Sequence, residues 1–93
     1  ELAERANVLR AQAATALANL HLARRQVEIV DENLALMDRF VELARTKYAA
    51  GTVTQSDVLR AEVEREGLRA ERAAFTRDVE LAGSALNVLL DRG

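Results

Sequence analysis

Apolar residues recur every three or four positions from Leu2 to Tyr48, without one polar interruption. This spacing places them on one face of an α-helix and is typical of a coiled-coil seam. A helix from about residue 2 to 50 would be roughly 70 Å long, so it needs a packing partner along its length. The predicted seam consists of Leu2, Ala6, Leu9, Ala13, Ala16, Leu20, Ala23, Val27, Val30, Leu34, Met37, Val41, Ala44 and Tyr48.

A second seam of the same kind follows a short interruption. It is broken only by Arg65 and Arg72, whose aliphatic stems can cover apolar surface while the guanidinium reaches water. Its apolar members are Val58, Ala61, Leu68, Phe75, Val79, Ala82, Leu86 and Leu89. The prediction is an all-α fold, a long antiparallel two-helix coiled-coil hairpin in a single unit over residues 1–93, with helices at about 2–50 and 55–90 and a turn at 51–54.

The composition agrees with long helices, because proline is absent and glycine occurs only 4 times. The net charge of −2 provides no basic field for nucleic acid, so no nucleic-acid partner is expected. Cysteine is absent, which excludes thiolate metal sites. No apolar run approaches the roughly 18 residues that a membrane-spanning helix needs.

The first helix carries a second apolar stripe, which repeats every seven residues and is broken only by Thr15. It lies about 160° from one edge of the seam. Its members are Val8, Leu22, Ile29, Leu36, Leu43 and Ala50. Two separated stripes indicate a helix with neighbours on both flanks, as in a curved palisade or barrel of helices; the alternative is a wider face in a three- or four-helix bundle. Either way, we expect the chain to self-associate as dimers or higher oligomers.

The interruption carries the residues that end one helix and begin the next. Gly51 stands where a left-handed residue closes a helix. Thr54 is the predicted N-cap, with Asp57 three residues later in the capping-box position. Val53 and Val58 are spaced for a hydrophobic staple. These local signals predict a tight turn.

The pattern of this turn resembles the TolC-like outer membrane efflux proteins, with the heavy-metal branch nearest. The resemblance runs over nearly the whole chain and includes "FVELARTK" before the turn and "ALNVLLDRG" after it. The turn residues that carry it are Tyr48, Gly51, Asp57, Val58, Leu59, Ala61 and Glu62. It implies a periplasmic segment of an outer membrane protein of a Gram-negative bacterium: one hairpin of the long periplasmic α-barrel, within a larger chain that forms a homotrimer.

The resemblance also implies a role for the turn as the tip that docks the periplasmic adaptor, which links the channel to an inner-membrane pump. The docking residues would be Ala50, Gly51, Thr52 and Val53. A small residue beside glycine lets another backbone come close, which gives the assignment a physical basis. The chain would then be part of a passive export conduit.

The family's tip tyrosine and aspartate help to hold the channel closed. By position these are Tyr48 and Asp57, with Ser56 as a candidate partner. Each has a structural explanation as well, because Tyr48 ends the seam and Asp57 completes the cap. Arg60 stands where some members carry a further acid, so a cation-selective constriction does not transfer directly.

Catalysis has little support in this sequence, and we expect no enzyme, no cofactor and no metal site. The single histidine, His21, falls on the polar side of the first helix. The acidic pair Asp31-Glu32 and the acidic series from Glu62 to Glu66 lack the Glu-x-x-His spacing of helical di-metal sites. They are most simply solvated faces.

Two other functions stay open. The first is the hairpin of the adaptor itself, whose usual tip pattern sets a leucine three residues after an arginine and a serine seven further. Counted from Arg45, that spacing reaches Tyr48 and Gln55, so the pattern fails. The second is a purely structural coiled-coil module, which explains the seam but not the second stripe.

Overall fold

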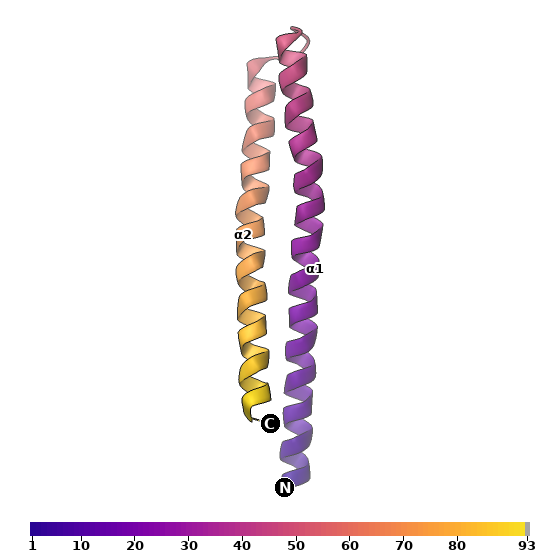
Figure 1. Cartoon of the computed structure of the whole chain (residues 1–93), viewed down its shortest axis with the longest axis vertical. Helices are drawn as coiled ribbons and strands as arrows, with labels where there is room; N and C mark the ends of the chain where they lie inside the picture. The colour runs from indigo at the N-terminus through magenta and orange to yellow at the C-terminus, as the bar shows by residue number, and fades with distance from the viewer. Residues whose placement is uncertain (93) are drawn as a thin grey trace. The chain divides into compact units, whose positions relative to one another are not determined.

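The computed structural model describes residues 1–92, and its two helices form an antiparallel hairpin (Figure 1). Helix α1 spans Leu2–Ala49 and helix α2 spans Gln55–Arg92. No strand occurs in this described range. The predicted all-α fold, two long helices packed against each other, is confirmed, and both helices begin and end within two residues of the expected positions.

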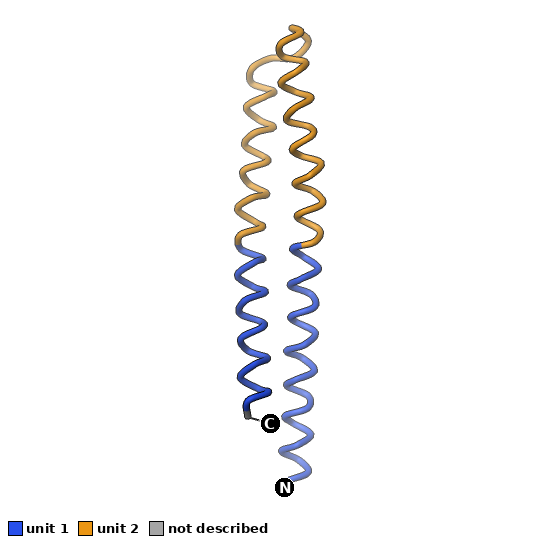
Figure 2. The backbone as a smooth tube through the Cα atoms, in the orientation of Figure 1, with its two compact units in different colours: residues 1–27, 74–93 blue, residues 28–73 orange. Residues whose placement is uncertain are grey.

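The chain divides into two compact units, each of which contains a segment of both helices (Figure 2). Unit 1 comprises residues 1–27 and 74–93, and unit 2 comprises residues 28–73, including the turn. The seam provides the core of each unit.

The core of unit 2 is made by small and branched side chains from both of its helical segments. Val41 is completely buried, and Ala61 on the facing helix is 1% exposed. Val30, Ala44 and Val58 are also buried. Valine and alanine allow the two helices to approach closely along this stretch, since they are small enough to interdigitate.

The core of unit 1 contains fewer buried residues than the core of unit 2. Its buried residues are Ala16, Leu20 and Ala23, all on α1. The seam residues of α2 in this unit are half-buried, namely Phe75, Val79, Ala82, Leu86 and Leu89. The seam therefore continues through unit 1 with less complete burial.

Both ends of the predicted seam are exposed in the structure. Leu2 is 86% exposed and Ala6 is exposed, because in unit 1 helix α1 continues past the end of α2 (Figure 2). Tyr48 is 48% exposed in the last turn of α1. Over the described residues, neither helix contains a stretch that is both long and apolar enough to cross a membrane.

Candidate functional site

The turn between the helices ends α1 with a Schellman motif. Gly51 has a φ of 77°, and its backbone N–H donates to the carbonyl of Tyr48 at 2.9 Å. The N–H of Thr52 donates to the carbonyl of Lys47 at 2.9 Å, and its hydroxyl donates to the same carbonyl at 3.0 Å. These bonds satisfy carbonyls that the end of a helix leaves without partners.

The start of α2 is fixed by a reciprocal capping box. The N–H of Asp57 donates to Thr54 Oγ1 at 3.2 Å, and the N–H of Thr54 donates to Asp57 Oδ2 at 3.0 Å. The aspartate therefore reaches back to the N-cap, although glutamate is the usual residue at this position. Val53 is half-buried and Val58 is buried, in the two positions of the predicted staple.

The capping box also changes the acidity of Asp57. The hydrogen bond from the Thr54 backbone N–H lowers the pKa of this carboxyl, and the Thr54 side chain and the charge of Arg60 act in the same direction. Hydrogen bonds to the charged form favour that form. Asp57 is therefore a negative charge fixed in the first turn of α2, where the helix dipole also favours it.

The predicted docking residues lie on an accessible surface at this turn. Ala50, Gly51 and Thr52 are exposed, and Val53 is half-buried. A Cβ atom added at Gly51 would meet nothing within 4 Å. The backbone at Gly51 is therefore open to an approaching partner, while the hydrogen bonds that fix the turn all come from within the chain.

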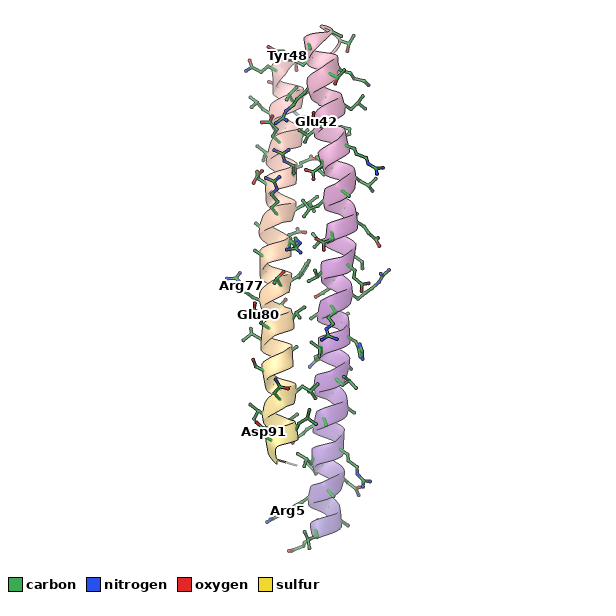
Figure 3. All side chains as sticks on the ribbon, viewed as in Figure 1. Arg5, Glu42, Tyr48, Arg77, Glu80 and Asp91 are labelled. Atoms are coloured by element: carbon green, nitrogen blue, oxygen red, sulfur yellow. The ribbon has the colours of Figure 1, made fainter. Side chains whose placement is uncertain are left out.

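The three predicted gating residues, Tyr48, Ser56 and Asp57, are all exposed. Tyr48 lies in the last turn of α1 near the hairpin turn (Figure 3), and Ser56 is exposed in the first turn of α2. The Asp57 carboxylate is engaged with Thr54. Over residues 1–92, no hydrogen bond joins Tyr48 to Ser56 or Asp57. The capping role of Asp57 is shown, and a gating role stays a prediction.

A small pocket of about 230 Å³ lies beside the turn in unit 2. It is lined mainly by apolar atoms, with the charged residues Lys47 and Asp57 among its members. The remaining lining residues are Phe40, Leu43, Ala44 and Val53. The pocket thus connects the predicted docking residue Val53 with the apolar stripe of α1.

The apolar stripe on α1 is left exposed by the described residues 1–92. In unit 2, Ile29, Leu36 and Leu43 are 42%, 62% and 50% exposed. In unit 1, Val8 and Leu22 are 56% and 60% exposed. Hairpin formation buries much of the seam but leaves this stripe exposed. The seam and the stripe are therefore separate surfaces.

A set of ion pairs that the sequence did not predict joins the two helical segments of unit 2. Arg72 Nε donates to Asp31 Oδ1, and Arg45 Nη2 donates to Glu62 Oε1 at 3.1 Å. Arg65 Nη1 lies 3.9 Å from Asp38 Oδ1. Hydrogen bonds to these carboxylates raise the pKa of both Arg45 and Arg72.

The sequence signal for these ion pairs is a seven-residue repeat of charged residues. Asp31, Asp38 and Arg45 occupy one face of α1 directly beside the seam, and Arg65 and Arg72 occupy the facing seam of α2. The arginines that interrupt the second seam are therefore partners of a charged column on the first helix. Arg65 differs from Arg72 in that its side chain is only 17% exposed, and its Nε makes no hydrogen bond within the described part of the chain.

The single histidine and the acidic residues of the described range provide no metal-binding group. His21 is exposed on α1. Among the described residues, no group of three or more histidine, cysteine, aspartate and glutamate side chains is arranged to hold a metal ion. Comparisons of the chain with models of protein families, with curated proteins and with solved structures find no match.

Proposed function

We propose that this chain is a hairpin of the periplasmic α-barrel of a TolC-like channel in the outer membrane of a Gram-negative bacterium. Its turn would bind the periplasmic adaptor of a tripartite efflux pump, and the channel would act as a passive conduit. The proposal begins from the resemblance of residues 47–62 to that family. One structural observation carries it: the turn is held by its own hydrogen bonds and leaves Gly51 open.

The turn is suited to binding because it is already ordered. The Schellman motif and the capping box fix its backbone before any partner arrives. A surface that is ordered in advance loses less conformational freedom on binding. At Gly51 the missing side chain lets a partner helix approach the backbone directly.

The exposed stripe supports the second part of the proposal, lateral neighbours in an α-barrel. Leu36 and Leu43 remain half or more exposed after the hairpin has formed. Rows of exposed apolar side chains on a helix mark contact surfaces when they are contiguous. Neighbouring hairpins of a homotrimer would cover this row.

Binding of the cognate adaptor hairpin to the wild-type chain and to Gly51→Trp tests the docking role. Gly51→Ala is the matched control, because both variants force a side chain into the left-handed conformation, whereas only tryptophan adds bulk. We expect Gly51→Trp to weaken adaptor binding at least tenfold relative to Gly51→Ala, measured by calorimetry or pull-down. Equal binding by the wild type and Gly51→Trp would remove the docking role.

A further inference from the structure

Arg65 is a charged residue within the packed seam of unit 2. Its side chain is only 17% exposed, and its Nη1 atom lies 3.9 Å from Asp38 Oδ1. Its Nε atom lies 3.6 Å from Glu66 Oε1, is buried and forms no hydrogen bond with a described residue. A buried N–H without a hydrogen bond costs stability, and an apolar residue of similar size is often more stable at such a position. Stability alone therefore does not explain an arginine here.

The apolar seam does not by itself fix which residues of the two helices lie opposite one another. The seam positions of α1 carry no charge from Leu2 to Tyr48, so a pairing shifted by seven residues would still bring apolar side chains together. Such a shift would slide one helix past the other by roughly 10 Å. Because the chain folds back on itself, the point of reversal would move by only half of this shift, about one helical turn. A further signal is needed to select one pairing.

A row of charged residues beside the seam of α1 supplies such a signal. Its members are seven residues apart and consist of two aspartates between two arginines, namely Arg24, Asp31, Asp38 and Arg45. The facing seam of α2 contains two arginines with the same spacing, Arg65 and Arg72. In unit 2 each of these arginines lies against one of the aspartates.

A shift of seven residues in either direction would break this match. In one direction, Arg65 would leave its aspartate and face Arg45. In the other direction, Arg72 would leave its aspartate and face Arg24. Like charges at a contact are unfavourable, most of all for a side chain as little exposed as that of Arg65. Both shifted pairings therefore replace an attraction by a repulsion.

We propose that Arg65 and Arg72 form a register lock: together with the aspartates of α1, they select the observed pairing of the two helices at some cost to stability. A polar residue at a seam position can fix the pairing of a coiled coil in this way. Because a shifted pairing would move the point of reversal, the lock also keeps the open Gly51 at the turn. It requires no partner molecule, so it holds or fails independently of adaptor binding.

Moving the two aspartates along α1 tests the lock. In Asp31→Arg with Arg45→Asp, the acidic pair moves seven residues towards the turn, so that it matches the arginines of α2 only in a shifted pairing. Spin labels at Ala35→Cys and Leu59→Cys report the pairing, because both positions are exposed in unit 2 and the chain contains no cysteine. We expect the wild-type charges to give one distance between the labels. The exchanged charges should add a second distance that is longer by up to roughly 10 Å, because the shifted pairing moves Leu59 further from Ala35 along the helix axis.

Glu32→Arg with Arg39→Asp is the matched control for this exchange. It makes the same change of charge one residue further along α1, where neither residue forms an ion pair with the described part of α2. An excess of unlabelled chain restricts the measurement to distances within one chain, and circular dichroism verifies that the helices are retained. The control should keep the single wild-type distance. An exchange variant that also keeps only this distance would overturn the proposal.

Removal of the seam arginines gives a second test. Arg65→Leu with Arg72→Leu makes the seam of α2 apolar throughout, so we expect the midpoint of thermal unfolding to rise while both shorter and longer label distances appear. Arg60→Leu with Arg69→Leu is the matched control, since it removes two arginines of α2 outside the seam and should keep the single distance. A single wild-type distance without the seam arginines would overturn the lock. A lowered midpoint would contradict the stability cost and indicate that these arginines serve stability instead.

Discussion

Unit 2 and unit 1 are built from the same two helices but are held together by different interactions. Unit 2 contains the hydrogen-bonded turn, ion pairs between its segments and the completely buried Val41. Unit 1 buries Ala16, Leu20 and Ala23 and leaves an uncharged groove beside them. This contrast shows that a coiled-coil seam does not by itself give both units an equally well buried core. The turn end satisfies its own backbone and buries its core on both helical segments, whereas the other end buries residues of α1 alone and leaves an open groove beside them.

The largest expected difference between the units is the cost of shortening a valine. Val41→Ala should lower the free energy of unfolding by about 2 kcal/mol, because it removes two buried methyl groups and leaves a cavity. Val8→Ala in unit 1 should change it by less than about 0.5 kcal/mol, since Val8 is 56% exposed. Urea unfolding at low protein concentration measures both. Equal losses of unfolding free energy in the two variants would contradict the difference in burial between Val41 and Val8.

The next largest effect concerns the turn that closes unit 2. Gly51→Ala should destabilise the chain by about 1–2 kcal/mol, because alanine in the left-handed conformation brings its Cβ close to the following carbonyl oxygen. No neighbouring atom would clash with the added methyl group, so the cost would come from the backbone alone. Thermal unfolding followed by circular dichroism measures it. An unchanged midpoint would mean that the Schellman motif does not contribute to closing unit 2.

A gain of stability should follow from replacing the glycines within α2. Gly67→Ala in unit 2 and Gly83→Ala in unit 1 should each stabilise the chain by up to about 1 kcal/mol, because both glycines are helical and an added Cβ meets nothing within 4 Å. A smaller gain at Gly83 than at Gly67 would indicate that the helix is less fully formed in unit 1. Chemical denaturation of the two variants side by side gives the comparison.

Most of the fold was predictable from the sequence because its signals are local. Gly51, Thr54 and Asp57 act within a few residues of one another, and the hydrogen bonds they make are the predicted ones. The seam was predictable for a related reason, since its repeat depends only on helix geometry. The degree of burial along the seam was not, because it depends on which residues of the facing helix lie opposite each position.

The ion pairs were not predicted because they depend on which residues of the two helices lie opposite one another. Asp31 and Arg72 are 41 residues apart in the chain, and only the position of the turn brings them together. The predicted roles of the site residues also differ in whether they depend on nearby or distant contacts. The capping role of Asp57 follows from neighbours in sequence, whereas a docking role for Val53 depends on a second molecule.

Reversing one charge should expose the contribution of the ion pairs to unit 2. Arg45→Glu should destabilise the chain by about 0.5 kcal/mol, and adding Glu62→Arg should restore most of the loss, because exposed pairs contribute only modestly. The effect should shrink in high salt, which screens exposed charges. A double variant no more stable than Arg45→Glu would show that this pair does not help to hold the two segments together.

The smallest effect is a pH dependence confined to the turn of unit 2. The pKa of Asp57 is lowered in the folded chain by the hydrogen bonds from Thr54, whereas in the unfolded chain it returns to its ordinary value of about 3.9. The unfolded chain therefore binds the proton more readily, so this contribution to stability is fully present above about pH 4 and is lost as the pH falls through the folded pKa. Asp57→Asn should remove this part of the pH dependence, measured by urea unfolding between pH 2 and pH 7. Because the carboxylate is exposed, water limits the effect, and an unchanged acid profile in Asp57→Asn would mean that the capping box closes unit 2 without using its charge.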